Sequence, residues 1–531
     1  MQLYKINAAT EFPSAHARGI NYVQPSVEDN RDRRFASAEE VGSFFYSEII
    51  RNGTPELSGV EEEIIILSQN GKPILHDEFQ VFLQDLLRAL PNGQATPGRT
   101  LSGDVLPVLK GTFNQGHIKL ETNTAVVEYA HAPRDNVWAL CRQSNDFLEI
   151  LERVATKHGL ILLGSGVVPS VPWEDFKKYA IPSEDFAYSW NHVQTNTRPE
   201  YCRTVFGTMG IHHNMGFSDP ELMARYTTTV LRLLPTMMAI VGNSPIWDFQ
   251  HSHDEQGQPL LSHRGHIQLK YGAVFGMDGL EYLYPDFLLD KDATFESIVR
   301  GLLNMPLDRT MANGEKIYCG KLTMAQYLQN GIIYNEERVF PNIDTLTMML
   351  REPISDIRLS MTGSAPRVEA RAHDGVSQPV SIALDAFYRG VLANLDEAQN
   401  LMSGLEKNEV RKQRIQVCRK GLASPVTHRD TTIKTQRDLA LQLLGCAEDG
   451  LIQRGQCEEV FLNPLFALAE TGVNPAQRML MAWKNGDRRA FFDAIAYNKK
   501  SFADGATFQW PMHGFIGNRA TKALVPRTMY G

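Results

Sequence analysis

Hydrophobic and polar positions alternate with two different periods along this chain, and the change comes near Gly375. Before that residue, short apolar runs with a period of about two predict strands, and segments with a helical period lie between them. The expected strands are 60–68, 125–130, 160–163, 209–217, 357–362 and 367–372. The expected helices are 38–52, 136–158 and 220–241, which follow the capping residues Ser37, Asp135 and Asp219.

The chain after Gly375 has a helical character. Amphipathic segments at 377–404, 405–421, 432–450 and 474–486 predict helices, and the tail after about residue 502 is expected to be loop-like. No Ser/Gly-rich linker separates the two parts. We therefore expect an α+β core over 1–375, with a sheet and flanking helices, and a helical region over 376–531 packed on the same core.

Composition narrows the class of protein. Of the 531 residues, 43% are hydrophobic and 21% are charged, which is typical of a globular chain. The net charge of −8 disfavours bulk binding to nucleic acid or anionic membranes. No apolar run approaches the roughly 18 residues of a membrane span, and the N-terminal segment lacks the apolar region of a secretory signal. Six cysteines without a CxxC pair favour reduced thiols and a cytoplasmic location.

Acidic residues inside strand patterns are the first chemical signal. Glu61, Glu62 and Glu63 run directly into an apolar segment. With a two-residue period, Glu61 and Glu63 share one face of the strand and Glu62 takes the other. Two carboxylates on one face repel each other unless a cation lies between them. The alternative is a solvated strand start with no ligand.

Glu128 is a second acidic residue in an otherwise apolar strand, and Glu121 precedes it by seven residues. That odd spacing places the two on opposite faces of a straight strand, so they converge only if the chain turns near Asn123. The alternative for Glu128 is a buried salt bridge to a lysine or arginine.

Two histidines occur together in the segment Gly207–Gly216. Alternation places His212 and Asn214 on a face with small neighbours, which leaves room for a ligand, and His213 on the apolar face. We assign His212 to the site and regard His213 as a packed core histidine. A purely structural role for His212 is the alternative.

Charges also alternate on the last expected strand. Arg367, Glu369 and Arg371 share one face, and Arg358 lies on the preceding strand. This row combines a candidate metal ligand, Glu369, with arginines that suit an anionic substrate. A solvated ladder of paired charges is the alternative.

Together these residues supply five carboxylates and one imidazole, a donor set that suits Mg²⁺ or Mn²⁺ better than a structural zinc. The candidates are Glu61, Glu63, Glu121, Glu128, His212 and Glu369. Several such cations beside arginines can hold a nucleoside triphosphate. No P-loop or Gly-x-Gly-x-x-Gly segment is present, so phosphate binding is expected to use metals and sheet-borne groups.

The chain resembles the glutamate–cysteine ligase type 2 family over roughly residues 40–490. Each matching motif is short, and their order and spacing carry the resemblance. They lie at Gly59–Glu63, Glu121–Pro133, Gly210–Asn214, Leu233–Trp247, Asp356–Ser360, Arg367–Asp374, Ala447–Leu451 and Gly472–Leu480. The resemblance implies a curved, mainly antiparallel sheet cradle, similar to glutamine synthetase and guanido kinases, with helices outside.

The resemblance also implies roles for the candidate residues. The six residues named above are implied to bind two or three Mg²⁺ ions, and Glu61, Glu369 and Arg371 are the expected catalytic residues. Arg358 and Arg371 are implied to contact phosphate or a substrate carboxylate. Asn214 and, by a looser match, Arg264 are expected beside the substrate or ATP.

The implied reaction joins a carboxylate of L-glutamate to an amine, with ATP as co-substrate and an acyl phosphate as intermediate. Cysteine is the expected amine, as in glutathione or a related thiol pathway, and no nucleic-acid or membrane partner is expected. The alternatives are a different amine, a non-catalytic nucleotide-binding relative, and a metal-dependent amide hydrolase. The histidines at 251, 253, 263 and 266 are expected to lie in a polar loop, with a zinc site as the alternative. The oligomeric state is not predicted.

Overall fold

The computed structural model describes residues 33–497 except for 56, 101, 172–174, 182–206, 271–276, 308, 314, 319–320, 352–355, 363–364 and 485–487. The expected tail after residue 502 lies outside the described residues, as do Cys202 and Cys319. Of the other cysteines, Cys141, Cys418 and Cys446 are buried free thiols, as expected of small core residues, and Cys457 is exposed.

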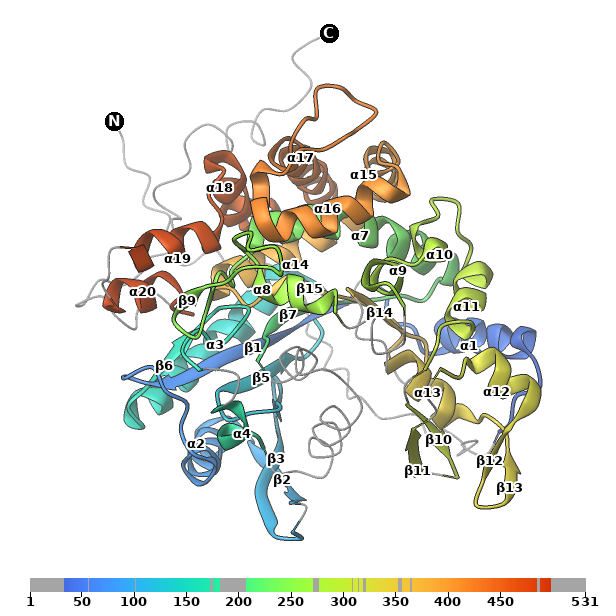
Figure 1. Cartoon of the computed structure of the whole chain (residues 1–531), viewed down its shortest axis with the longest axis horizontal. Coiled ribbons are helices and arrows are strands. Elements are labelled where there is room, and N and C mark those ends of the chain that lie inside the picture. The colour runs from blue at the N-terminus through green and yellow to red at the C-terminus, as the bar shows by residue number, and fades with distance from the viewer. Residues whose placement is uncertain are drawn as a thin grey trace.

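A nine-stranded sheet forms the centre of the molecule (Figure 1). Eight strands follow the order β14-β15-β7-β1-β5-β4-β3-β2, β6 pairs with β1, and every neighbouring pair is antiparallel. The strands are β1 Ser58–Ser68, β2 Gln94–Arg99, β3 Val105–Phe113, β4 Gly116–Leu120, β5 Val126–His131, β6 Leu160–Leu163, β7 Gly210–Gly216, β14 Ile357–Ser360 and β15 Arg367–Asp374. The expected α+β class with an antiparallel sheet is confirmed.

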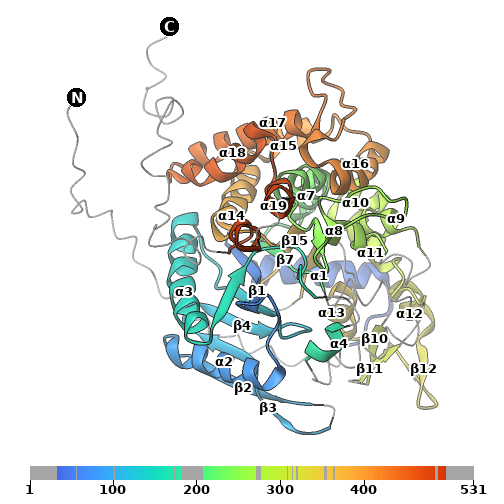
Figure 2. The same ribbon diagram turned by 60° about the vertical axis from the view of Figure 1, so that its left-hand side comes forward.

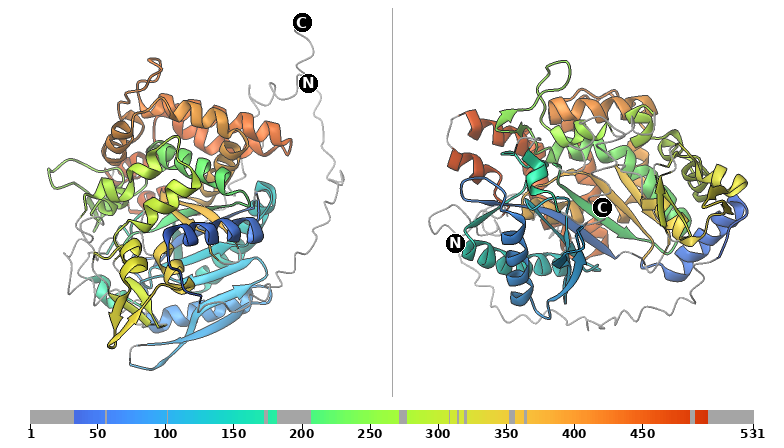
Figure 3. Two further views of the ribbon diagram at one scale, coloured as in Figure 1. Left: turned by 90° about the vertical axis from the view of Figure 1, so that its right-hand side faces the viewer. Right: turned by 60° about the horizontal axis from the view of Figure 1, so that its bottom comes forward.

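All six expected strands are present, and three strands of the sheet were not expected. β2 exposes most of its side chains, and β4 is five residues long. Short or exposed strands carry little alternation of their own, because they depend on pairing with neighbours. The β2–β3 hairpin therefore could not be predicted from its own sequence pattern, because it depends on pairing within the sheet. Figure 3 shows it at the opposite end of the molecule from the C-terminal helices.

The expected long helices form, with two corrections. α1 (Ala38–Asn52) is capped by Ser37, and α7 (Pro220–Val241) is capped by Asp219 and continues through Pro235. α3 (Val137–Lys157) is capped by Asn136, whose side chain accepts from the amide of Ala139, and not by Asp135. The expected helix 377–404 is two helices, α14 (Gln378–Ala393) and α15 (Leu395–Met402).

The break between α14 and α15 has a local cause. Asn394 leaves the helical region at φ −123°, ψ 44°, and its side-chain amide donates to the carbonyl of Cys446 at 3.1 Å. An asparagine side chain that bonds a neighbouring backbone competes with helix continuation. The bond ties this turn to α17 (Gln436–Arg454), which packs along α14.

Helices cover the face of the sheet that carries Val60 and Ile211, and they share one apolar core with it. α7 and α14 lie against β15, β7 and β1, and α2 (His76–Ala89) and α3 lie together against the β3–β5 part (Figure 2). The opposite face carries Glu61 and Glu63, and beyond them an apolar part with Ile65 and Leu67 that packs against residues near the C-terminus, such as Met479 and Phe491. Because C-terminal helices contribute to the shared core, they help to fix the strands that carry this polar face.

The remaining elements surround this centre. They are α4 Phe176–Tyr179, α8 His263–Gln268, α9 Gly279–Leu283, α10 Asp286–Leu289, α11 Phe295–Leu303, α12 Met324–Asn330, α13 Ile343–Arg351, α16 Lys407–Lys420, η4 Gly421–Ala423, η5 Glu458–Leu462, α18 Asn463–Thr471, α19 Pro475–Lys484 and α20 Arg488–Ala494. Three small hairpins join β8 Ile246–Trp247 to β9 Gln250–His251, β10 Arg309–Ala312 to β11 Glu315–Tyr318, and β12 Ile332–Tyr334 to β13 Glu337–Val339. Among the described residues, no helix has the length and apolarity needed to cross a membrane.

Candidate active site

Strand register brings the predicted acidic residues together on the polar face. Glu61 on β1 lies opposite His212 on β7, and Glu63 lies opposite Glu128 on β5. Glu369 on β15 lies opposite Asn214 on β7. Opposed residues on one face of neighbouring strands have Cβ atoms about 4.5–5.5 Å apart. Residues separated by more than 300 positions in the sequence therefore form one site.

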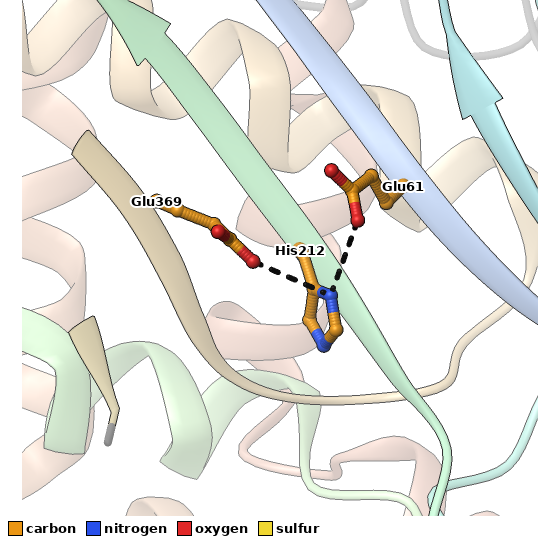
Figure 4. Close-up of side chains that lie close together, drawn as sticks. All are labelled: Glu61, His212 and Glu369. Atoms are coloured by element: carbon orange, nitrogen blue, oxygen red, sulfur yellow. Dashed lines mark ion pairs between the residues drawn. The ribbon is translucent and has the colours of Figure 1, made fainter. Parts of the chain in front are cut away.

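The first acidic group consists of Glu61, His212 and Glu369 (Figure 4). Nδ1 of His212 lies 3.7 Å from Oε2 of Glu61 and 3.6 Å from Oε1 of Glu369. The His212 side chain is 6% exposed, and its Nδ1 makes no hydrogen bond. Burial raises the pKa of Glu61, but His212 and the nearby cations outweigh burial and hold that pKa well below its usual range.

The second acidic group consists of Glu63, Glu121 and Glu128. The chain turns between β4 and β5, where the Asn123 side chain accepts from the amide of Ala125 at 2.8 Å. The condition for Glu121 and Glu128 to converge, a turn near Asn123, is therefore met, and their carboxylates lie in one group. Burial raises the pKa of Glu121 well above its usual range, and the Glu128 carboxylate raises it further. Three carboxylates this close favour either a shared proton or a bound cation.

The assignment of neighbouring side chains to opposite faces is confirmed. Glu62 points to the helix-covered face, where Oε2 lies 2.7 Å from Nε2 of His131. His213 also lies on that face, where Nε2 is 2.7 Å from Oδ1 of Asp385 and the ring stacks on Tyr388.

Arginines flank Glu369 at the edge of the first group. Arg371 donates to Oε1 of Glu369, and Nη1 of Arg358 lies 3.5 Å from Oε2. Burial raises the pKa of Glu369, but these two guanidinium groups outweigh burial and lower the pKa to about 2. The expected charge row on β14 and β15 is therefore present, and it is largely buried and not solvated, because Glu369 is 3% exposed and Arg371 15%.

Arg264 lies beside Gly210, the first residue of β7, and supports the backbone of β15. Its side chain is buried and donates from Nη2 to the carbonyl of Arg371 at 2.9 Å, while Nη1 has no hydrogen-bond partner. The β7–β15 register shifts between Ala370 and His373, so Arg371 lies in a bulge. Bulges commonly re-aim a side chain beside a functional site. Arg264 thus contacts the site through Arg371.

Asn214 connects the two neighbouring strands on the polar face. Its Nδ2 donates to Oε1 of Glu61 at 3.3 Å, and its Oδ1 accepts from Nε of Arg367 at 2.8 Å. Asn214 is buried, so it fixes the orientation of Glu61 in this structure.

Lys119 is the site residue that sequence reasoning missed. It lies on β4, opposite Glu128, and its Nζ is 2.5 Å from Oε1 of that carboxylate. Glu128 therefore also makes the salt bridge to a lysine that was its alternative interpretation. Burial lowers the pKa of Lys119, and Glu61 and Glu128 outweigh burial and raise it. The only signal in the sequence is a polar alternation of His117 and Lys119, which needs β4 to be recognised as a strand.

The donor atoms of both acidic groups suit divalent cations. In each group one possible ligand atom per residue lies within 4.8 Å of the others. The set is mostly carboxylate oxygen, and His212 offers a buried nitrogen without a hydrogen bond. Within the described residues these are the only groups of three potential ligands. The histidines at 251–266 form no such group, and His266 instead lies 3.1 Å from Glu255.

A family model and several curated relatives match this chain. The model of a family described as glutamate–cysteine ligase family 2 matches residues 57–494. The chain is similar to chloroplastic glutamate–cysteine ligase B of Oryza sativa subsp. japonica, at 25% identity over 68% of this chain and 68% of that protein. It is also similar to the chloroplastic enzyme of Arabidopsis thaliana, at 27% identity over 68% and 64%. A solved glutamate–cysteine ligase from Francisella tularensis, in complex with AMP, covers 83% of this chain and 87% of its own, with 14% identity and a TM-score of 0.49.

Proposed function

Because this chain belongs to the glutamate–cysteine ligase family 2, we propose that it joins the γ-carboxylate of L-glutamate to the amine of cysteine. It is an ATP-dependent ligase that forms a C–N bond. The observation that carries the proposal is the pair of adjacent acidic groups on one sheet face, bordered by Arg358 and Arg371. Such a face offers ligands for cations and positive charge for phosphate.

In the proposed reaction, a γ-carboxylate oxygen of glutamate attacks the γ-phosphorus of ATP and ADP leaves. The amine nitrogen then attacks the carbonyl carbon of the acyl phosphate, loses a proton, and releases phosphate. Both steps rely on alignment and on compensation of negative charge. No covalent nucleophile from the protein is needed.

The six metal candidates divide into two sites. Glu61, His212 and Glu369 would hold one cation, and Glu63, Glu121 and Glu128 another, with Mg²⁺ as the proposed ion and Mn²⁺ as a substitute. Bound cations would supply neutralisation of the phosphate oxygens and fix their orientation.

The arginines perform a different task. Arg358 and Arg371 are proposed to bind anionic oxygens of the substrates, because each offers a charged fork. Glu369 restrains both guanidinium groups through direct ion pairs. Arg264 donates to the backbone carbonyl of Arg371, and Asn214 donates to the Glu61 carboxylate, so the strand that carries Arg371 and the side chain of Glu61 are both held. This support keeps the charged groups in place before substrate binds.

The cysteine acceptor is the part of the proposal that rests most on the relatives. Another amino acid or a small amine is the second candidate, because one fold hosts relatives with different substrates. The cytoplasmic location stays a prediction, and the matching plant relatives are chloroplastic.

The test is release of ADP with Mg²⁺, L-glutamate and a panel of amines, with identification of the product by mass. Turnover that requires cysteine and yields a γ-glutamyl–cysteine amide supports the proposal. Turnover with another amine alone corrects the acceptor. No ADP release with any acceptor contradicts the ligase function, and the variant Arg371→Gln serves as the inactive control.

A further inference from the structure

Lys119 lies between the two acidic groups of the candidate active site. Its Nζ is 2.5 Å from Oε1 of Glu128 and 3.6 Å from Oε2 of Glu61. Glu61 belongs to the group that contains His212, and Glu128 belongs to the group that contains Glu121. A single ammonium group therefore contacts both groups that are proposed to bind cations.

The sheet fixes the base of this side chain. β4 pairs with β5, and the register places Lys119 directly opposite Glu128. On its other side, Lys119 lies opposite Lys110 of β3. Lys110 is exposed, whereas the Glu128 side chain is only 6% exposed. The contact with Glu128 is thus unlike an ordinary surface ion pair, which contributes little.

The ammonium group and a divalent cation compete for the same oxygens. Two like charges a few ångström apart repel each other strongly where water is partly excluded. Lysine has a flexible four-carbon stem, and the Lys119 side chain is 38% exposed, so its head group has a route away from the carboxylates. Glu61 and Glu128 have shorter side chains and less room, because they are 18% and 6% exposed.

From this arrangement we propose that Lys119 is a positioning residue that substitutes for a divalent cation. In the cation-free enzyme it holds Glu61 and Glu128 together against their mutual repulsion, and it leaves them when cations bind. The inference rests on the proposed cation sites and adds the residue that keeps them ordered when they are empty. Cation binding then involves an exchange of one charged partner for another.

The experiment measures Mn²⁺ binding by the electron paramagnetic resonance signal of free Mn²⁺, without nucleotide, in three variants. Lys119→Gln removes the charge, Lys119→Arg retains it, and Lys110→Gln removes a charge one strand farther away. For Lys119→Gln we expect Mn²⁺ affinity to rise about tenfold or more, because no ammonium has to be displaced. Lys119→Arg and Lys110→Gln are expected to stay within about threefold of the unmodified protein.

Thermal unfolding with and without Mn²⁺ gives a second readout that does not depend on activity. In EDTA, Lys119→Gln should unfold at a lower temperature than Lys110→Gln, because the buried Glu128 and the half-buried Glu61 lose their cation. Saturating Mn²⁺ should raise the midpoint of Lys119→Gln by more than it raises that of the unmodified protein.

The outcomes separate this inference from the proposed function. If the unmodified protein binds Mn²⁺ and Lys119→Gln binds it equally or more weakly, the substitution role of Lys119 is wrong while the cation sites stand. If the unmodified protein binds no Mn²⁺, the cation sites themselves fail, and the role of Lys119 fails with them.

Discussion

His212 and His213 are consecutive in the chain, yet their side chains belong to opposite faces of the sheet. His212 faces Glu61 and Glu369 at 3.7 and 3.6 Å, whereas His213 lies 2.7 Å from Asp385 beneath the helices. One residue step in a strand therefore separates a candidate cation ligand from a core contact.

The two histidines should respond differently to substitution. His212→Ala is expected to lower Mn²⁺ affinity about tenfold or more and to lower the unfolding free energy of the cation-free protein by about 1–2 kcal/mol at most, because Glu61 loses the partner that lowers its pKa. His213→Ala should cost about 2–4 kcal/mol, because Asp385 is buried and loses a hydrogen bond. Mn²⁺ titration and urea unfolding in EDTA check both. Equal loss of stability in the two variants would contradict the separation of faces.

The neighbouring glutamates of β1 offer a matched set of variants. Glu62→Gln should lower the unfolding free energy by about 1–3 kcal/mol and leave Mn²⁺ affinity nearly unchanged, because its carboxylate pairs with buried His131. Glu63→Gln should instead weaken Mn²⁺ binding about tenfold or more and leave the unfolding free energy nearly unchanged. The same chemical change is thus placed on each face of one strand. Loss of Mn²⁺ binding in Glu62→Gln would count against the assignment.

The Glu369 carboxylate is expected to make the stability of the folded protein depend on pH. Its pKa in the folded protein is about 2, below its ordinary value of 4.5, because Arg371 and Arg358 outweigh the effect of burial. A lowered carboxyl pKa contributes stability that is fully present above about pH 4.5 and is lost as the pH falls toward 2. Such a shift corresponds to roughly 3 kcal/mol.

The comparison with Glu369→Gln isolates that contribution. In EDTA, the unmodified protein should exceed the variant in unfolding free energy by a constant amount, roughly 3 kcal/mol, between pH 5.5 and 7.5. The difference should narrow as the pH falls below about 4.5. Urea unfolding of both proteins at matched pH measures it, and ADP release by the variant should be abolished. A difference that grows on acidification would show that the ion pairs do not stabilise the folded state.

Alternation along single strands predicted much of the site, because a period of two assigns faces whatever the fold. It separated Glu61 and Glu63 from Glu62, and it placed His212 and His213 correctly. For Glu121 and Glu128 it gave only the condition that the chain must turn near Asn123 for them to converge. The roles of these residues in binding and catalysis stay predictions.

What the pattern could not supply depends on pairing between strands. β4 has only Ile118 and Leu120 as apolar residues, so its strand character comes from β3 and β5, and Lys119 was missed with it. Alternation also could not predict which residues on different strands lie opposite each other, since register depends on the whole sheet. The break between α14 and α15 could not be predicted for the same reason, because Asn394 at that break bonds a carbonyl of α17.

Gly210 leaves room for Arg264, which supports the backbone of Arg371. A Cβ atom at Gly210 would overlap the guanidinium of Arg264 and lie 2.9 Å from the carbonyl of His373. Gly210→Ala should therefore displace Arg264, free the carbonyl of Arg371, and lower turnover about tenfold or more, with a stability cost of about 2–4 kcal/mol.

A double-mutant cycle tests whether Gly210→Ala acts through Arg264. Arg264→Ala removes the overlapping group, so adding Gly210→Ala to it should cost at least about 1 kcal/mol less in stability than in the unmodified protein. Part of the cost should persist, because the contact with the His373 backbone remains. Turnover of the double variant should equal that of Arg264→Ala, since both changes act on the same carbonyl. Independent effects that add within about 0.5 kcal/mol would mean that Gly210 acts on the strand itself and not through Arg264.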